Sequence, residues 1–317
     1  MAHLVPALAA LFLAAACSSE PVSTGEALKA SDIVQLRWIA RGSDRVAVLT
    51  RLPPSCEAAG ETEQRRLGKI AFESPALLGG AAARMGLACS SCHLNGRGNV
   101  DFFLDGLSDK AGMADVTSSV LSRVRGDGNF NPKPIPDVGL RDGKQIKDRR
   151  GAEFAAKVHG LVEEEFDGQV APKPVFDAVI AYLDGLDPAA CGTRAVWVDP
   201  LRDLDAVHAA YDGALAAQDK DVSLFYLRAA RARLERIHER YAAPEQGAIR
   251  QELVDISRGM EVLADAIRTD RKISVFEPGW DKLLVRLLGE APRSLYDPEV
   301  LRAALAAEGA AQSMPKG

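Results

Sequence analysis

The sequence predicts a mainly helical protein with two domains, the second of which is a bundle of helices. In the last third of the chain, apolar residues recur at alternating spacings of three and four, the period of an amphipathic helix. A chain of 317 residues is longer than one small domain requires. The hydrophobic share of 47% and the charged share of 26% are ordinary for a globular protein. The net charge of −5 gives no reason to expect nucleic-acid binding, and we set that class aside.

The N-terminus has the pattern of an export signal. Residues 4–16 form an apolar run that is too short to cross a bilayer and has the length of a signal peptide. Small residues lead into Cys17 and a polar stretch follows it, so residues 1–17 resemble a bacterial lipoprotein signal in which Cys17 is lipidated. The alternative is an ordinary secretory signal, because the first three residues contain no Lys or Arg. Both alternatives predict export, and the first also predicts a lipid anchor in a membrane.

Residues 18–55 are expected to form a tether and a small N-terminal addition. Residues 18–30 are rich in Ser, Glu, Pro, Thr and Gly, which favours a flexible linker. Residues 33–40 fit either a helix or a strand. Residues 45–49 contain β-branched side chains that predict a short strand.

Cys89, Cys92 and His93 form a C-x-x-C-H motif, which is the attachment site of a c-type haem. The two thiols would bind the haem vinyl groups as thioethers, and the histidine would be the proximal ligand of the iron. A C-x-x-C pair can also serve zinc or a redox dithiol, but the sequence has no second C-x-x-C to complete a zinc site. The histidine directly after the second cysteine favours haem. We therefore expect one covalently bound haem c with its iron.

Residues 56–191 are expected to form the haem domain. Four helices are predicted in it, at residues 62–71, 115–124, 152–166 and 175–186. Between residues 96 and 151 the chain is rich in Gly, Asp, Asn and Pro, and the proline-rich run 129–136 excludes regular structure. Such a loop would wrap the haem faces.

Three stretches of this domain carry a family resemblance. They are the segment LGKIAF at 67–72, the C-x-x-C-H motif at 89–93 and the segment AVIAYL at 178–183. Together they resemble a class I cytochrome c, and the first also resembles the di-haem cytochrome c peroxidase superfamily. Those peroxidases carry two C-x-x-C-H motifs and this chain has one, so their electron-relay mechanism cannot be carried over.

Cys56 and Cys191 are the remaining cysteines, and in an exported protein they most simply form a disulfide. This bridge would close the haem domain at its base. The alternative is two free buried cysteines. If bonded, their Cα atoms are expected to lie about 4.4–6.8 Å apart.

The sixth ligand of the iron is open. The resemblance to class I cytochromes implies a ligand from the loop between the motif and the last helix, where Met113 is the only methionine and His159 the only further histidine. Three alternatives follow: His159, which we favour, Met113, and no protein ligand.

Residues 195–317 are predicted to be a helical domain for docking or scaffolding. One apolar stripe runs through Ile249, Leu253, Ile256, Met260, Leu263 and Ile267. Three further stripes are expected, at Leu201, Leu204, His208, Tyr211 and Leu215, at Leu227, Leu234 and Tyr241, and at Trp280, Leu283, Leu284, Leu287 and Leu288. A terminal helix would begin at Asp297-Pro298.

These features predict an exported, lipid-anchored mono-haem cytochrome that carries single electrons between periplasmic or membrane redox proteins. Two alternatives remain. One is a peroxidase-like enzyme with an open iron site, in which His159 or Glu163 would be the acid-base residue. The other is a non-redox module in which haem senses a ligand or stabilises the fold.

Overall fold

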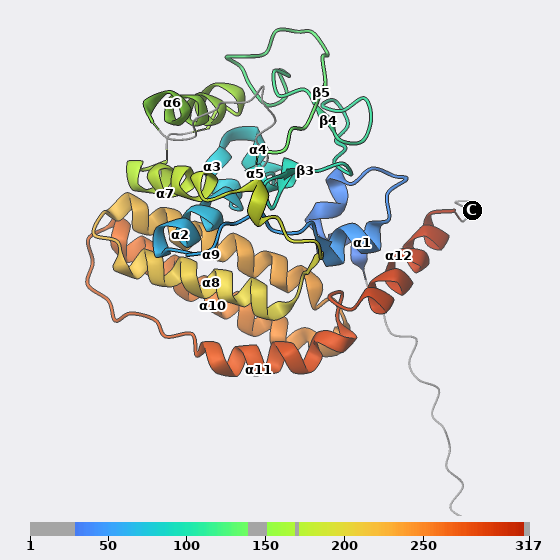
Figure 1. Cartoon of the computed structure of the whole chain (residues 1–317). Helices are drawn as coiled ribbons and strands as arrows, with labels where there is room; N and C mark the ends of the chain where they lie inside the picture. Colours follow the sequence, from blue (N-terminus) through green and yellow to red (C-terminus); the bar gives the residue numbers. More distant parts are fainter. Residues whose placement is uncertain (1–28, 139–150, 169–170, 314–317) are drawn as a thin grey trace, which may run out of the picture.

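The computed structural model describes residues 29–138, 151–168 and 171–313 (Figure 1). The expected signal segment, Cys17 and most of the expected tether lie outside these ranges. The described residues are mainly helical, and their strands pair only as three two-residue antiparallel ladders. The mainly helical class is therefore confirmed. No helix among the described residues is long and apolar enough to span a membrane.

The second half of the chain folds into the predicted helices. They are α8 (Pro200–Ala216), α9 (Lys220–Arg240), α10 (Gly247–Arg268), α11 (Trp280–Glu290) and α12 (Pro298–Ser313). The side chains of Asp199 and Asp219 cap the first two helices by accepting hydrogen bonds from backbone N–H groups of the first turn. In Figure 1, α8, α9 and α10 form a layer below the shorter elements of the first half.

The apolar stripe predicted for α8 is wrong at its edges. Leu204 and Tyr211 are buried as predicted, but Leu201 and Leu215 are 53% and 40% exposed. Val207 is fully buried in place of its neighbour His208, which is only partly buried. Val207 and the small alanines beside it allow α9 to pack closely against this face. The stripes predicted for α9 and α10 are confirmed, apart from Ile267, which is only partly buried.

The first half consists of short elements. In chain order its helices are the 3₁₀ turns η1 (Ala30–Asp32) and η2 (Val34–Trp38), α1 (Arg45–Thr50), α2 (Glu63–Phe72), α3 (Pro75–Leu78), α4 (Gly80–Arg84), α5 (Cys89–Cys92), α6 (Ala152–Gly160), the π-helical turn η3 (Leu161–Glu165) and α7 (Lys173–Asp184). Its strand pairs are β1 (Arg51–Leu52) with β6 (Val196–Trp197), β2 (His93–Leu94) with β3 (Arg97–Gly98), and β4 (Met113–Ala114) with β5 (Lys133–Pro134). Helices α2 and α7 pack against each other beside α5 (Figure 1).

Three predictions in this half are wrong. The proline-rich run 129–136, expected to exclude regular structure, contains the two-residue strand β5. The strand expected at residues 45–49 is the helix α1, because the Asp44 carboxylate caps it by accepting from the Ala47 N–H at 3.0 Å. The helix expected at residues 115–124 is a series of turns. There Asp115, Ser118 and Ser122 accept hydrogen bonds from nearby backbone N–H groups, which competes with helix formation.

The two predicted domains share one apolar core. Ile70 and Phe72 of α2 and Val179 of α7 belong to the same buried cluster as Val207 of α8 and Leu234 of α9. A second, smaller core joins η1 and α1 to α12. The half of the chain that contains the cysteine-histidine motif is therefore packed against the helical layer through a continuous apolar core.

Candidate functional site

Helix α5 presents the two motif cysteines from one helical turn. Both cysteines are free thiols, and both pack against the shared core. Burial raises the pKa of Cys89 to about 12 and that of Cys92 to about 12, so both sulfurs carry their protons at neutral pH. The turn is fixed from its start, since the Ala88 N–H donates to the Ser91 hydroxyl at 3.1 Å.

The imidazole of His93 is fixed by one of its nitrogens. Its Nδ1 lies 3.0 Å from the Pro136 carbonyl oxygen. A carbonyl can only accept, so the contact assigns the proton to Nδ1 and leaves a lone pair on Nε2. Burial lowers the pKa of His93 to about 4, although the bond to Pro136 and the charge of Asp137 act in the opposite direction. The ring is therefore neutral at physiological pH, as a metal ligand must be.

The end of the proline-rich segment packs against the hairpin that follows the motif. His93 pairs with Gly98 across the β2–β3 hairpin, and the Gly98 N–H donates to Asp137 at 2.6 Å. A Cβ atom at Gly98 would lie 2.2 Å from the Ile135 carbonyl oxygen, so only glycine permits this approach. The hairpin thus places Pro136 beside His93.

Asparagines close the opposite side of the motif. The side chain of Asn99 donates to the Ser91 carbonyl at 2.8 Å, and its backbone N–H donates to the Cys92 carbonyl at 2.8 Å. Asn95 has a left-handed φ of 49° and donates to the Pro53 carbonyl at 2.7 Å. These bonds connect the end of α5 to the N-terminal addition.

These residues fit a covalently attached c-type haem in their chemistry. Two free thiols lie on one turn, and the following histidine has one nitrogen bonded to a backbone carbonyl, the arrangement that orients a metal-binding imidazole. The described residues contain no cluster of three or more His, Cys, Asp and Glu side chains suited to a metal ion.

The two candidate sixth ligands lie in different settings. The His159 ring stacks on Phe176 with centroids 3.9 Å apart, and its Nδ1 is 3.6 Å from Glu163. Met113 lies in β4, where it pairs with Pro134. Pro134 is two residues before Pro136, whose carbonyl holds His93. The ring and ion-pair contacts of His159 thus involve neither motif cysteine nor His93.

The predicted disulfide is present in the structure. The sulfurs of Cys56 and Cys191 are 2.10 Å apart, and their Cα atoms are 3.9 Å apart, which is closer than the expected range. Backbone hydrogen bonds also join the two segments that carry these cysteines. The Asp187 N–H donates to the Cys56 carbonyl at 2.7 Å, and the Gly192 N–H donates to the Ser55 carbonyl at 3.0 Å.

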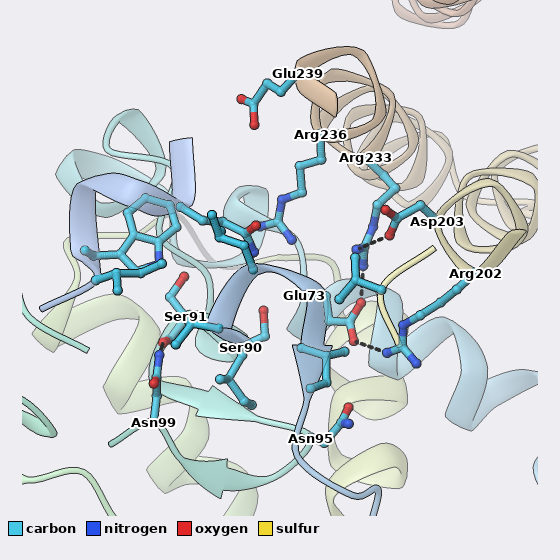
Figure 2. Close-up of a pocket in the computed structure, with 18 of the residues that line it drawn as sticks. Glu73, Ser90, Ser91, Asn95, Asn99, Arg202, Asp203, Arg233, Arg236 and Glu239 are labelled. Atoms are coloured by element: carbon cyan, nitrogen blue, oxygen red, sulfur yellow. Dashed lines mark hydrogen bonds and ion pairs between the residues drawn. The ribbon is translucent and has the colours of Figure 1, made fainter. Parts of the chain in front are cut away.

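Sequence reasoning missed a cluster of charged side chains behind the motif (Figure 2). The Arg233 guanidinium forms ion pairs with Glu73 and with Asp203, the latter at 3.2 Å, and Arg202 approaches Glu73 at 3.7 Å. Burial raises the pKa of Glu73, but the arginines and Lys69 outweigh it and lower that pKa to about 2. The cluster connects α2 to α8 and α9. Glu73 lies 160 residues away from Arg233 in the sequence, so no local pattern could have indicated the cluster.

Comparisons of the chain with protein-family models, with curated proteins and with solved structures found no match.

Proposed function

We propose that this protein is an exported mono-haem c-type cytochrome that transfers single electrons. Haem would be attached to Cys89 and Cys92, with His93 as the proximal ligand, in a fold resembling a class I cytochrome c. The observation that carries the proposal is the His93 imidazole, which is neutral, bonded through Nδ1 to Pro136 and adjacent to two free thiols on one turn. A redox dithiol would not require this histidine geometry. A structural zinc site would require further ligands, and the described residues contain no cluster of three or more His, Cys, Asp and Glu side chains suited to a metal ion.

The chain's residues have defined tasks in this proposal. Cys89 and Cys92 would hold the haem as thioethers, since addition of a thiol to a vinyl group moves the thiol proton to the neighbouring carbon and needs no oxidant. The Pro136 carbonyl holds the proton on Nδ1 and directs the lone pair of Nε2 away from the loop. When bound, the haem iron would supply one-electron redox chemistry. Packing of Cys89 and Cys92 against the apolar core would limit water near that cofactor.

Export and membrane attachment belong to the same proposal. The signal-like N-terminus and lipidation at Cys17 would place the protein in the periplasm on a membrane surface, where periplasmic or membrane redox proteins are its partners. The Cys56–Cys191 disulfide suits an oxidising compartment.

The direct experiment is haem attachment in variants of the motif. Cys89→Ala and Cys92→Ala should each leave one thioether, and the double variant should lose covalent haem altogether. Haem staining after denaturing electrophoresis and a pyridine haemochrome spectrum measure this. Full covalent haem in the double variant would refute the proposal.

The sixth ligand is tested by spectra of two variants. We propose His159, with Met113 as the alternative. In the first case His159→Ala converts a low-spin ferric spectrum to high-spin and Met113→Ala does not, and in the second case the results are reversed. A spectrum that is high-spin in the unaltered protein and shifts on addition of peroxide would instead support the peroxidase-like function.

A further inference from the structure

A cavity lies on the face of α5 that meets the helical layer, and its size suits a small ligand. Its volume is about 70 Å³. Its walls come from the N-terminal addition, from the motif segment at Ser90 and Ser91, and from α8 and α9. One enclosed water needs about 10–15 Å³ by a comparable measure, so this space holds several waters or one ion with its neighbours.

The charges around the cavity do not balance. Four arginines and three carboxylates line it, which leaves one positive charge when all are ionised. Two of the carboxylates, Glu73 and Asp203, already bind Arg233, and Asp203 also accepts from the Tyr296 hydroxyl at 2.7 Å. The Arg240 donors go to neutral acceptors, among them the Leu295 and Leu49 carbonyls at 3.0 and 2.8 Å.

Arg236 is the cation that remains. Within the described part of the chain, no ion pair or hydrogen bond joins its guanidinium to another residue, and Figure 2 shows the side chain extending from α9 into the cavity. Burial and the neighbouring Arg233 lower the pKa of Arg236 to about 10, although the charges of Glu73, Asp203 and Glu239 act in the opposite direction. A charged, planar guanidinium that has no protein partner can donate hydrogen bonds to the oxygens of an anion.

Two further groups shape the site. The Ser90 hydroxyl also lines the cavity and makes no hydrogen bond with another residue that the structure describes, so it is a second free donor there. Glu239 also lines the cavity, where it accepts from the Val34 N–H at 3.2 Å. Its carboxylate would compete with a bound anion.

We propose that this cavity is a binding site for one small oxyanion, such as phosphate, sulfate or a short carboxylate, with Arg236 as the principal ligand and Ser90 as a second donor. The site is independent of the proposed cytochrome function, because neither residue is a haem ligand. It lies directly behind the turn that carries Cys89 and Cys92.

Calorimetric titration of the full-length protein with sodium phosphate, sulfate and acetate, at constant ionic strength, tests the proposal. At least one of these anions should bind saturably with one site per chain. Tight phosphate or sulfate binding would identify an inorganic tetrahedral anion, and tight acetate binding would identify a carboxylate. No saturable binding of any of the three would overturn the proposal.

Variants assign the site. Arg236→Gln should weaken binding about tenfold or more, because a charged hydrogen bond is lost. Arg231→Gln removes the same charge from the same helix, where Arg231 pairs with Glu261 outside the cavity, and should leave binding unchanged. Glu239→Gln should strengthen binding and keeps the test decisive if the Arg236 variant fails to fold. Equal weakening by both arginine variants, or unchanged or weaker binding in the Glu239 variant, would contradict the assignment.

Discussion

The helical layer and the motif region of this molecule are stabilised in different ways. The layer, which consists of α8, α9 and α10, contains helices of up to 22 residues with fully buried side chains such as Tyr211, Leu227 and Tyr241. The motif region, residues 89–138, contains elements of two to four residues. Its turns are fixed by Asp and Ser side chains that accept hydrogen bonds from backbone N–H groups and by Asn side chains that donate to carbonyls. The layer depends on packing, whereas the motif region depends on these hydrogen bonds.

The largest expected effect is loss of the disulfide. Replacing both Cys56 and Cys191 by Ala should lower the free energy of unfolding by up to about 5 kcal/mol, the chain-entropy value for their separation of 135 residues. Urea denaturation followed by circular dichroism measures the change, with chemical reduction of the unaltered protein as the control. If the double variant and the unaltered, oxidised protein were equally stable, the backbone hydrogen bonds near Cys56 would be sufficient to hold this part of the chain without the disulfide.

The second effect concerns the buried charges that connect the end of α2, which precedes the motif region in the chain, to the helical layer. Arg233→Met should cost about 3–5 kcal/mol, because Glu73 is left buried without its main partner. Arg231→Met on the same helix removes a half-exposed pair with Glu261 and should cost at most about 1 kcal/mol. Similar losses of stability in the two variants would show that the buried charge cluster has no special role in joining α2 to the helical layer.

The third effect separates packing in the layer from packing in the loop. Leu227 is 0% exposed, and Leu227→Ala should cost about 2–5 kcal/mol. Val124 of the loop is 69% exposed, and Val124→Ala should change stability by less than about 0.5 kcal/mol. A large cost at Val124 would show that the loop is packed against something in solution.

The fourth and smallest effect is a dependence on pH. The pKa of Glu73 is about 2 in the folded protein, below its usual value of 4.5. Its ion pairs therefore contribute their full stability above about pH 4.5, and this contribution is lost as the pH falls towards about 2. The unfolding midpoint of the unaltered protein should fall more steeply over this range than that of Glu73→Gln. Parallel curves would contradict the low pKa.

Sequence periodicity was sufficient for the long helices and insufficient for the short ones. The stripe at Ile249, Leu253 and Ile256 fixes one face over many turns, so tertiary contacts do not change it. At Val46 and Val48 the β-branched side chains predict a strand. The segment is a helix of six residues instead, and the Asp44 carboxylate stabilises its first turn by accepting a hydrogen bond from the Ala47 N–H.

The candidate site was predictable where its residues are adjacent in the sequence. The C-x-x-C-H motif needs only its own five positions to be recognised, and the Cys56–Cys191 pairing followed from counting cysteines. The carbonyl that holds His93 lies 43 residues away from it, and Glu73 lies 160 residues away from Arg233. Only the fold brings them together.

The intact mass of the full-length protein, produced in cells that attach haem to exported proteins, tests the central claim most directly. We expect the mass of the processed chain plus one haem, and loss of that increment when Cys89 and Cys92 are both replaced by Ala. A chain without the increment, in which Cys89 and Cys92 are free thiols or bonded to each other, would contradict it.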